Sequence, residues 1–311
     1  MAAVEQADRR VASGIYPGGA AWADGRIVPV AEARIPITDW GFTRSDVTYD
    51  VVHVWQGRFF RLDDHLARFR ASIAGLRMTI PESAEEIARI LHDCVRASGL
   101  RDAYVAMICT RGSPAPGAPR HPAHCVNRFW AFAVPWAWVI PPEVQARGAH
   151  LLIAKTPRIP PECVDPTIKN YHWGDLTRAL FEASDAGADN AVLLDLDGYV
   201  TEGPGFNVFA VIDGTVVTPD RGVLEGITRR SVLELCAELG IPSRIGRITK
   251  QQLLEADEVF TATTAGGVMP VSRVDRRIYG NDRPGPISTR LKDRYWQKHD
   301  EGWYATPVDY G

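Results

Sequence analysis

The sequence is poor in lysine, has no long hydrophobic run and shows no paired cysteines. Only five lysines stand against thirty arginines in the 311 residues, so each lysine is a candidate for a special role. No run approaches the roughly eighteen apolar residues of a membrane span, and the first fourteen residues lack the apolar core of a signal peptide. These absences predict a cytoplasmic protein without a membrane partner.

The cysteines and the charge exclude further classes of protein. The five cysteines are scattered and form no C-x-x-C pair, which is typical of reduced packing residues and not of a disulfide framework. A formal charge of -3 without a basic run gives no electrostatic footprint for nucleic acid. We therefore expect small-molecule partners.

Several motifs are missing as well. The chain has no G-x-x-x-x-G-K-[ST], no H-E-x-x-H, no G-x-S-x-G and no G-x-G-x-x-G after a strand, which disfavours nucleotide-binding and serine hydrolase sites. One metal-like group, His121, His124 and Cys125, lies in a proline-rich loop without a second ligand pair at suitable spacing. We predict no metal site.

Apolar periodicity switches between strand and helix without the alternation of a doubly wound sheet, which predicts an α+β fold. Two helices are expected first, with Asp63 or Asp64 capping the first and Gly99 ending the second. The expected elements of the first half are helices over 62–77 and 82–100, strands over 103–111 and 128–135, and a long proline-rich loop over 112–124.

The second half carries two Asp-Gly hairpin signals, at Asp197-Gly198 and Asp213-Gly214, which predict antiparallel strands. A helix is expected over 227–240 and a strand running into a small-residue turn over 257–267. Closely spaced prolines make residues 135–146 the best linker candidate. We expect domains over 1–134 and 147–311.

A scattered polar set remains after these elements are placed, and each member alone could be an ordinary exposed residue. The set lies in five blocks whose order is more specific than any one block: "RLDDHLARFRAS", "KNYHWGDL", "TEGPGFNVF", "LEGITRR" and "TATTAGG". In that order the chain resembles the fold-type IV pyridoxal-phosphate enzymes, the class of branched-chain and D-amino acid transaminases. The blocks "SDVTYDVVHVW", "FRLDDH", "KNYHWGDL" and "TTAGG" are most similar to (R)-selective amine transaminases.

The resemblance implies the roles of the cofactor residues. Lys169 would form the Schiff base with pyridoxal 5'-phosphate, and only a primary amine can do this and then carry a proton. Lys155 is the rival, but the Asn-aromatic pattern does not follow it. Glu202 would pair with the pyridine nitrogen. The other implied cofactor contacts are Arg68, Gly226, Ile227, Thr228, Thr263 and Thr264 for the phosphate and Leu224 for the ring face.

Substrate residues follow from the same resemblance. Tyr49, Val51, Trp173 and Gly205 would surround the reacting carbon, with Arg44 nearby. One departure from the family pattern is Pro204, where a small residue is usual. Arg120, on the loop over 112–124, is a candidate for binding the substrate carboxylate, with a solvent-facing arginine as the alternative and Arg44 as the second choice.

The resemblance implies a two-domain enzyme with a smaller N-terminal α/β domain and a larger C-terminal domain with a mixed or antiparallel sheet. The expected protein is a homodimeric transaminase that moves an amino group from an (R)-amine or D-configured donor to a small keto acid such as pyruvate, by ping-pong kinetics. Three related activities stay open: D-amino acid transaminase, branched-chain transaminase and aminodeoxychorismate lyase. A non-catalytic binding module of the same fold is the remaining alternative.

Overall fold

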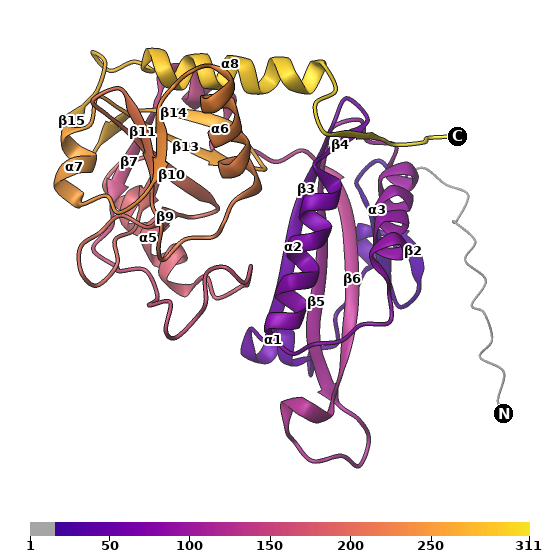
Figure 1. Ribbon diagram of the computed structural model, residues 1–311. Coiled ribbons are helices and arrows are strands. Elements are labelled where there is room, and N and C mark those ends of the chain that lie inside the picture. Colours follow the sequence, from indigo (N-terminus) through magenta and orange to yellow (C-terminus); the bar gives the residue numbers. More distant parts are fainter. Residues whose placement is uncertain (1–15) are drawn as a thin grey trace. The chain divides into compact units, whose positions relative to one another are not determined.

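The chain folds into two compact units, which are described separately. The computed structural model describes residues 16–311 (Figure 1), so the predicted absence of a signal peptide in the first fourteen residues falls outside the described part. The first unit runs to Ala137 and also holds Ile168–Tyr171 and Tyr304–Gly311, and the second unit holds Trp138–Thr167 and His172–Trp303.

A seven-stranded antiparallel sheet forms the centre of the first unit. Its strand order is β16-β4-β3-β5-β6-β1-β2. The strands are β1 (Ala20–Ala23), β2 (Arg26–Pro29), β3 (Val47–Trp55), β4 (Arg58–Phe60), β5 (Ala103–Pro114), β6 (Cys125–Pro135) and β16 (Ala305–Pro307). The helices are α1 (Trp40–Arg44), α2 (Leu62–Gly75) and α3 (Ala84–Ser98), with short 3-10 turns η1 (Val30–Glu32) and η2 (Pro122–His124).

Helices α2 and α3 pack on one face of this sheet. Side chains alternate along a strand, so Val52 and Val54 of β3 join the core beneath the helices, whereas Tyr49 and Val51 belong to a separate apolar cluster. The apolar stripe of α2 contributes Phe69 to the first core, where its side chain is fully buried. Strand β3 therefore carries two chemically different faces.

Both predicted helices of the first unit are present, but the predicted cap of the first is wrong. Helix α2 begins after Arg61 without a side-chain cap, because Asp64 instead accepts a hydrogen bond from Arg61 Nε at 2.7 Å. Helix α3 has a capping box between Ser83 and Glu86. It ends as predicted at Gly99, which takes a left-handed φ of 68°.

Strands β5 and β6 are longer than predicted. Their pairing resumes after an irregularity between Thr110 and Ser113, so Ser113 pairs with Val126 and Pro114 with Cys125. A bulge of this kind carries a ladder past a break in register, and a proline is tolerated where the strand ends. The predicted loop over 112–124 thus loses its first residues to β5, and its last three form η2.

The second unit contains a nine-stranded mixed sheet. Seven strands have the order β12-β11-β10-β13-β14-β7-β8, with β15 paired to β14 and β9 paired to β10. The strands are β7 (Ala149–Ile153), β8 (Asn190–Val192), β9 (Glu202–Gly203), β10 (Phe206–Ile212), β11 (Thr215–Thr218), β12 (Ser243–Ile245), β13 (Glu258–Thr263), β14 (Gly267–Val274) and β15 (Arg277–Ile278). The helices are α4 (Pro142–Arg147), α5 (Gly174–Asp185), α6 (Ile227–Glu238), α7 (Lys250–Glu255) and α8 (Pro286–Asp300).

One of the two Asp-Gly signals forms a full hairpin. Asp213 and Gly214 join β10 to β11 with φ values of 48° and 72°, the left-handed pair that a tight two-residue turn needs. The other signal closes only an isolated bridge between Leu194 and Val200. Among the described residues, no helix is both long and apolar enough to cross a membrane.

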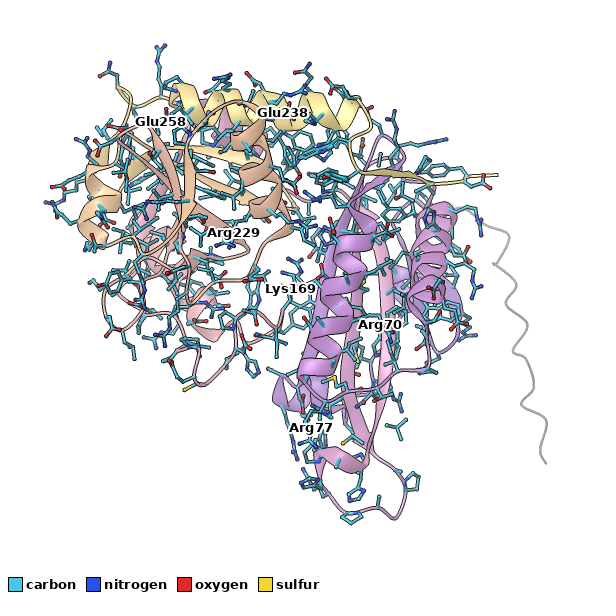
Figure 2. The ribbon with its side chains drawn as sticks, in the orientation of Figure 1. Arg70, Arg77, Lys169, Arg229, Glu238 and Glu258 are labelled. Carbon is cyan, nitrogen blue, oxygen red and sulfur yellow. The ribbon has the colours of Figure 1, made fainter. Side chains whose placement is uncertain are left out.

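The first unit includes segments that lie far along the chain from its main part. Strand β16 pairs with β4, and the carbonyl of Lys169 accepts a hydrogen bond from Thr48 of β3 at 2.7 Å. Figure 2 shows Lys169 beside α2 of this unit. The first unit therefore combines segments from both sides of the proline-rich stretch over 135–146. The expected linker itself ends in α4, because Pro142 can occupy the first turn of a helix.

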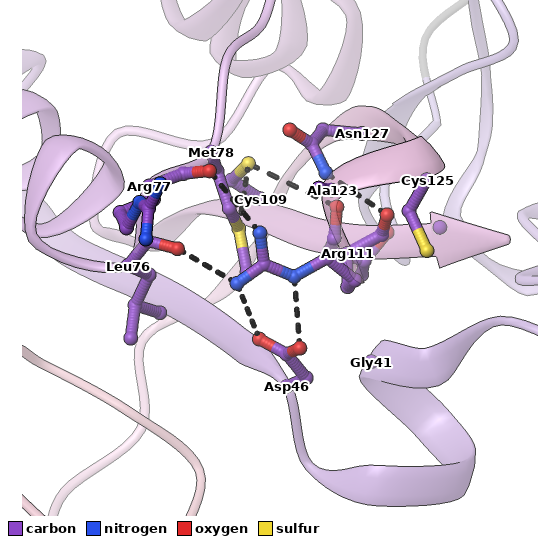
Figure 3. A network of polar contacts seen from close by, with 12 residues as sticks. Gly41, Asp46, Leu76, Arg77, Met78, Cys109, Arg111, Ala123, Cys125 and Asn127 are labelled. Atoms are coloured by element: carbon purple, nitrogen blue, oxygen red, sulfur yellow. Dashed lines mark hydrogen bonds and ion pairs between the residues drawn. The ribbon is translucent and has the colours of Figure 1, made fainter. Parts of the chain in front are cut away.

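A buried arginine anchors the end of α2 (Figure 3). Arg111 of β5 donates through Nε and Nη2 to both carboxylate oxygens of Asp46, at 2.8 and 3.0 Å. The same guanidinium donates to the carbonyls of Leu76 and Arg77, at 2.7 and 3.2 Å. Because the last carbonyls of a helix lack partners within it, this network fixes α2 against the entry to β3.

Candidate active site

The backbone of Lys169 is held along the edge of β3. Its carbonyl oxygen accepts hydrogen bonds from Thr48 Oγ1 at 2.7 Å and from Tyr49 N at 3.2 Å. Its amide nitrogen lies 3.4 Å from Ser72 Oγ of α2. Strand β4 pairs with β3 only at Val54–Trp55, so the edge of β3 beside Thr48 is open to the Lys169 segment.

The side chain of Lys169 lies over an aromatic ring. Its Nζ is 4.4 Å from the centroid of Tyr49, which stacks on Tyr171 at 4.0 Å. An ammonium group is attracted to such a ring face. Burial raises the pKa of the Tyr171 phenol, so this ring stays uncharged at neutral pH. The arrangement presents a half-buried primary amine in a fixed aromatic setting.

Arg68 of α2 forms a bidentate ion pair with Asp50 of β3. Arg68 Nε donates to Asp50 Oδ2 at 2.7 Å, and Nη2 donates to Oδ1 at 2.8 Å. His65, one turn earlier on α2, contacts Oδ1 through Nδ1 at 2.8 Å. The side chains of Asp50 and His65 are buried. A bidentate fork of this kind fixes both the place and the plane of the guanidinium.

The charges of this cluster follow from its burial. Burial by itself would raise the pKa of Asp50, but the Arg68 guanidinium and the His65 contact hold that pKa well below the ordinary carboxyl range. Burial lowers the pKa of His65, although Asp50 opposes the shift. At neutral pH the cluster is therefore one carboxylate, one guanidinium and one neutral imidazole, whose Nδ1–H donates a hydrogen bond to Asp50 Oδ1.

The other predicted residues of the first unit occupy different settings. Val51 shares the apolar cluster of Tyr49. Arg44, at the end of α1, is exposed and places its guanidinium 3.3 Å from the centroid of the Trp40 ring. Arg120 is exposed in the connection between β5 and β6. Within residues 16–311, neither arginine forms an ion pair with an acidic side chain, so these contacts do not distinguish the two candidates for binding the substrate carboxylate.

Glu202 is the centre of a buried charged cluster in the second unit. Its Oε1 accepts hydrogen bonds from Arg158 Nε and Nη2, at 3.1 and 3.0 Å, and Arg158 Nη1 donates to Asp175 at 2.7 Å. Burial alone would lower the pKa of Arg158, but Glu202 and Asp175 raise it. The rival lysine, Lys155, is exposed in the same unit.

Glu202 also organises the loop before α6. Its Oε2 accepts a hydrogen bond from Leu224 N at 2.9 Å, and Asn207 Nδ2 donates to Leu224 O at 2.8 Å. Gly226 is the residue before the first turn of α6, and an added Cβ would lie 2.0 Å from Asn207 Oδ1, so a larger residue would require Asn207 to move. The loop is thus bound from two neighbouring strands.

The start of α6 can bind an anion. Helix α6 begins at Ile227, followed by Thr228, and no side chain of the described residues caps it. Its first turn contains no acidic residue. Uncapped N–H groups at a helix N-terminus, together with the helix dipole, favour a phosphate or a carboxylate. Thr263 ends β13 and Thr264 follows in the turn, both half-buried.

Trp173 and Gly205 lie close together in the second unit. A Cβ added at Gly205 would lie 3.6 Å from Trp173 Cη2, and the glycine has a φ of 84°. The unusual Pro204 is buried directly before it. Glycine supplies the left-handed turn needed here, and Glu202 lies in β9, two residues before Pro204.

Five residues of these clusters escaped the sequence analysis: Asp50, His65, Arg158, Asp175 and Asn207. All five are polar residues, and for all but Asp50 nothing in the sequence indicates that the side chain is buried. Asp50 did offer one signal, since it interrupts the apolar strand "VTYDVVHVW" at a position that faces α2.

Comparison with known proteins identifies the family. The model of the amino-transferase class IV family matches residues 48–274. A putative branched-chain-amino-acid aminotransferase of Methanocaldococcus jannaschii is 31% identical over 88% of this chain and 94% of its own length. A D-alanine aminotransferase of Bacillus licheniformis is 30% identical over 86% of this chain and 93% of its own length.

A solved structure agrees in fold. The crystal structure of a branched-chain amino acid aminotransferase from T.th. with pyridoxamine 5'-phosphate superposes with a TM-score of 0.86 and 32% identity, covering 94% of this chain and 99% of that one. The predicted α+β architecture of fold type IV is therefore confirmed. The chain belongs to the class IV aminotransferases, and its cofactor is pyridoxal 5'-phosphate.

Proposed function

We propose that the protein transfers the amino group of an amino acid, of the branched-chain or D-configured type, to a small 2-oxo acid through Lys169. The observation that carries the proposal is the fixed, half-buried amine of Lys169 over Tyr49. The names of the similar proteins, branched-chain and D-alanine aminotransferases, support the substrate class. The branched-chain donor is our first choice because it is the name that recurs among those relatives.

The residues present fit the cofactor. The phosphate needs a guanidinium and backbone donors. Arg68 of the first unit has the guanidinium, and the uncapped start of α6 in the second unit has the backbone donors. The ring nitrogen needs a carboxylate, and Glu202 is a buried one. The bound cofactor supplies an electron sink that stabilises negative charge on the substrate carbon.

The roles of the protein groups follow from their chemistry. Lys169 Nζ would hold the cofactor through its aldehyde, and the free amine of Lys169 would carry a proton as general base and acid. Glu202 favours the protonated ring nitrogen, and Arg158 keeps its carboxylate oriented through two hydrogen bonds. Arg68 holds the phosphate, which leaves the reacting end free to exchange partners.

The substrate side chain is expected to contact the apolar face that β3 shares with its neighbours. Tyr49, Val51, Ile108 and Trp130 form one cluster on that face, which suits an aliphatic or aromatic substituent. Either Arg44 or Arg120 is proposed to bind the substrate carboxylate, since a carboxylate removed from water needs a partner. We further propose a homodimer, as the family resemblance implies.

An (R)-amine is the second candidate donor. The blocks "SDVTYDVVHVW" and "KNYHWGDL" favour it, and in the structure these blocks carry Tyr49, Lys169 and Tyr171 as neighbours. The similar proteins named above do not carry this activity in their names, so it ranks below the amino acid donors.

One panel of substrates separates the candidates. Purified protein is given L-leucine or D-alanine with 2-oxoglutarate, and (R)- or (S)-1-phenylethylamine with pyruvate, and the new amino acid is measured. The proposal predicts the highest kcat/KM with L-leucine or D-alanine, and Lys169→Ala should abolish it. A clear preference for (R)-1-phenylethylamine would establish the second candidate. Preference for the (S)-amine, or no transfer with any donor, would contradict both.

A further inference from the structure

Three consecutive residues of β3 contact Lys169 and Arg68, the two residues whose cationic side chains the proposed function assigns to the cofactor. Thr48 Oγ1 donates to the carbonyl of Lys169, the Tyr49 ring lies under Lys169 Nζ, and Asp50 receives the Arg68 guanidinium on both oxygens. The side chains of Thr48 and Asp50 are fully buried. One short stretch of strand therefore fixes two reactive groups from different parts of the chain.

Thr48 fixes the direction in which the lysine side chain leaves the backbone. The carbonyl oxygen of Lys169 accepts two hydrogen bonds, from Thr48 Oγ1 at 2.7 Å and from Tyr49 N at 3.2 Å. Two donors on one oxygen restrict rotation of that peptide plane, and Thr48 also pairs with Asn170 in an isolated bridge. The strand alone supplies the bond from Tyr49, so the hydroxyl of Thr48 is the additional restraint.

Asp50 fixes the plane of the guanidinium. Its Oδ1 accepts from Arg68 Nη2, His65 Nδ1 and Val51 N, and its Oδ2 accepts from Arg68 Nε. A guanidinium held on its Nε and Nη2 edge cannot rotate about its last torsion without losing both bonds. The orientation of Arg68 is thus set by the protein before any ligand arrives.

We propose that Thr48 and Asp50 are positioning residues, Thr48 for the reaction of Lys169 with the cofactor aldehyde and Asp50 for the contact of Arg68 with the cofactor phosphate. The inference rests on the proposed roles of Lys169 and Arg68. Aldehyde and phosphate are separate groups of one ligand, so the two residues should produce separable binding defects.

Three ligands distinguish these defects. Pyridoxal 5'-phosphate carries both groups, pyridoxamine 5'-phosphate lacks the aldehyde, and pyridoxal lacks the phosphate. The dissociation constant of each is measured by titration of the cofactor-free protein, followed by quenching of tryptophan fluorescence. No turnover is needed, so the result does not depend on which amino donor the enzyme uses.

Thr48→Val removes the hydroxyl and keeps the shape of the buried side chain. It should weaken pyridoxal 5'-phosphate about tenfold, as for the loss of one hydrogen bond, and leave pyridoxamine 5'-phosphate within about twofold. Thr48→Ser keeps the hydroxyl and should restore the wild-type ratio. An equal loss for both ligands indicates a merely structural role and overturns the assignment, as does no loss for either.

Asp50→Asn places an amide N–H where one carboxylate oxygen received Arg68. It should weaken both phosphorylated ligands about ten- to a hundredfold, as expected for charged hydrogen bonds, while pyridoxal changes less than about threefold. If Asp50→Asn does not fold, His65→Gln tests the same cluster and should give the same pattern at about three- to tenfold. An equal change in all three ligands, or in none, contradicts the assignment.

The protein offers a matched control. Asp46→Asn breaks the equivalent fork with Arg111 and should leave all three affinities unchanged while lowering the thermal midpoint.

Lys169→Ala and Arg68→Ala test the roles that the proposed function gives to Lys169 and Arg68. If Lys169→Ala keeps the visible absorbance of lysine-bound cofactor, or Arg68→Ala keeps the affinity for the phosphorylated ligands, the proposed roles fail and the inference falls with them. If those two variants behave as proposed and the Thr48 and Asp50 variants do not, the inference alone fails.

Discussion

The first unit contains two aspartate–arginine forks that look alike and have different neighbours. In both forks, the Nε and Nη2 atoms of an arginine donate to the two carboxylate oxygens of an aspartate in or just before β3. The donor–acceptor distances are between 2.7 and 3.0 Å. In the Asp46–Arg111 fork, the guanidinium continues to the carbonyls of Leu76 and Arg77 at the end of α2. In the Asp50–Arg68 fork, the aspartate also forms a hydrogen bond with His65. It follows Tyr49 in the strand, and the ring of Tyr49 lies under Lys169 Nζ.

The difference shows that ion-pair geometry does not by itself indicate function. Arg111 satisfies helix carbonyls that would otherwise lack a partner, so its role is explained by the fold. In the Asp50–Arg68 fork the same aspartate also contacts His65, and a fully buried carboxylate is costly unless it is paired in this way. Four predictions test this contrast.

Arg111→Ala should have the largest effect on stability. It leaves Asp46 without this partner and removes the side-chain donors to the carbonyls of Leu76 and Arg77, directly after α2, so the free energy of unfolding should fall by about 3 kcal/mol. Denaturant unfolding of the cofactor-free protein measures this change. Affinity for pyridoxal 5'-phosphate, measured under folding conditions, should remain within about twofold. A large loss of affinity in a folded protein would mean that both forks serve the site.

Arg68→Ala should reverse that pattern. The affinity for pyridoxal 5'-phosphate should fall by about ten- to a hundredfold, because a charged contact to the phosphate is removed. Pyridoxal should bind with nearly unchanged affinity. Equal weakening of both ligands would show that Arg68 supports the structure, as Arg111 does.

The pH dependence of stability should report on the Asp50–Arg68 fork at acid pH. The pKa of Asp50 is depressed in the folded protein, so the unfolded chain binds a proton there first as the pH falls below about 4, the ordinary carboxyl value. Stability from this group is present above that pH and is lost below it. Asp50→Asn should therefore flatten the acid limb of a plot of unfolding free energy against pH. An acid limb as steep as that of the wild type would contradict the assignment.

Asn127→Ala should give the smallest effect. Asn127 Nδ2 donates to Arg111 O at 2.9 Å and its Oδ1 accepts from Thr79 N at 2.7 Å, so the substitution should cost about 1–2 kcal/mol. Thermal unfolding measures the loss. Ligand affinities should not change, because Asn127 of β6, like the Asp46–Arg111 fork, is expected to contribute to stability and not to ligand binding.

Much of the fold could be predicted from the sequence. Periodicity located α2 and α3 because each packs one apolar stripe, and Asp213-Gly214 predicted its hairpin because few residues adopt its backbone angles. The cap of α2 was missed because the side chain of Asp64 pairs with Arg61, the residue before the helix, in place of capping the helix. The extension of β5 was missed because a proline was taken to end the strand.

The site was predicted only in part, and the physical reason is distance along the chain. Lys169 and Glu202 stand in blocks that resemble a family, so their chemistry could be named. Thr48 contacts a residue 121 positions away, and Arg158 contacts Glu202 across 44 positions. Such partners leave no local pattern. The roles assigned to Lys169, Glu202 and the substrate residues remain predictions until they are tested.

Chemical mapping of the cofactor-bearing lysine tests the central claim most directly. The purified holoprotein is reduced with borohydride, which makes the bond between lysine and pyridoxal 5'-phosphate permanent, and is then digested and analysed by mass spectrometry. The account predicts that the adduct is on the peptide containing Lys169 and is absent from the Lys169→Ala variant. An adduct on Lys155, or on any lysine other than Lys169, would contradict it.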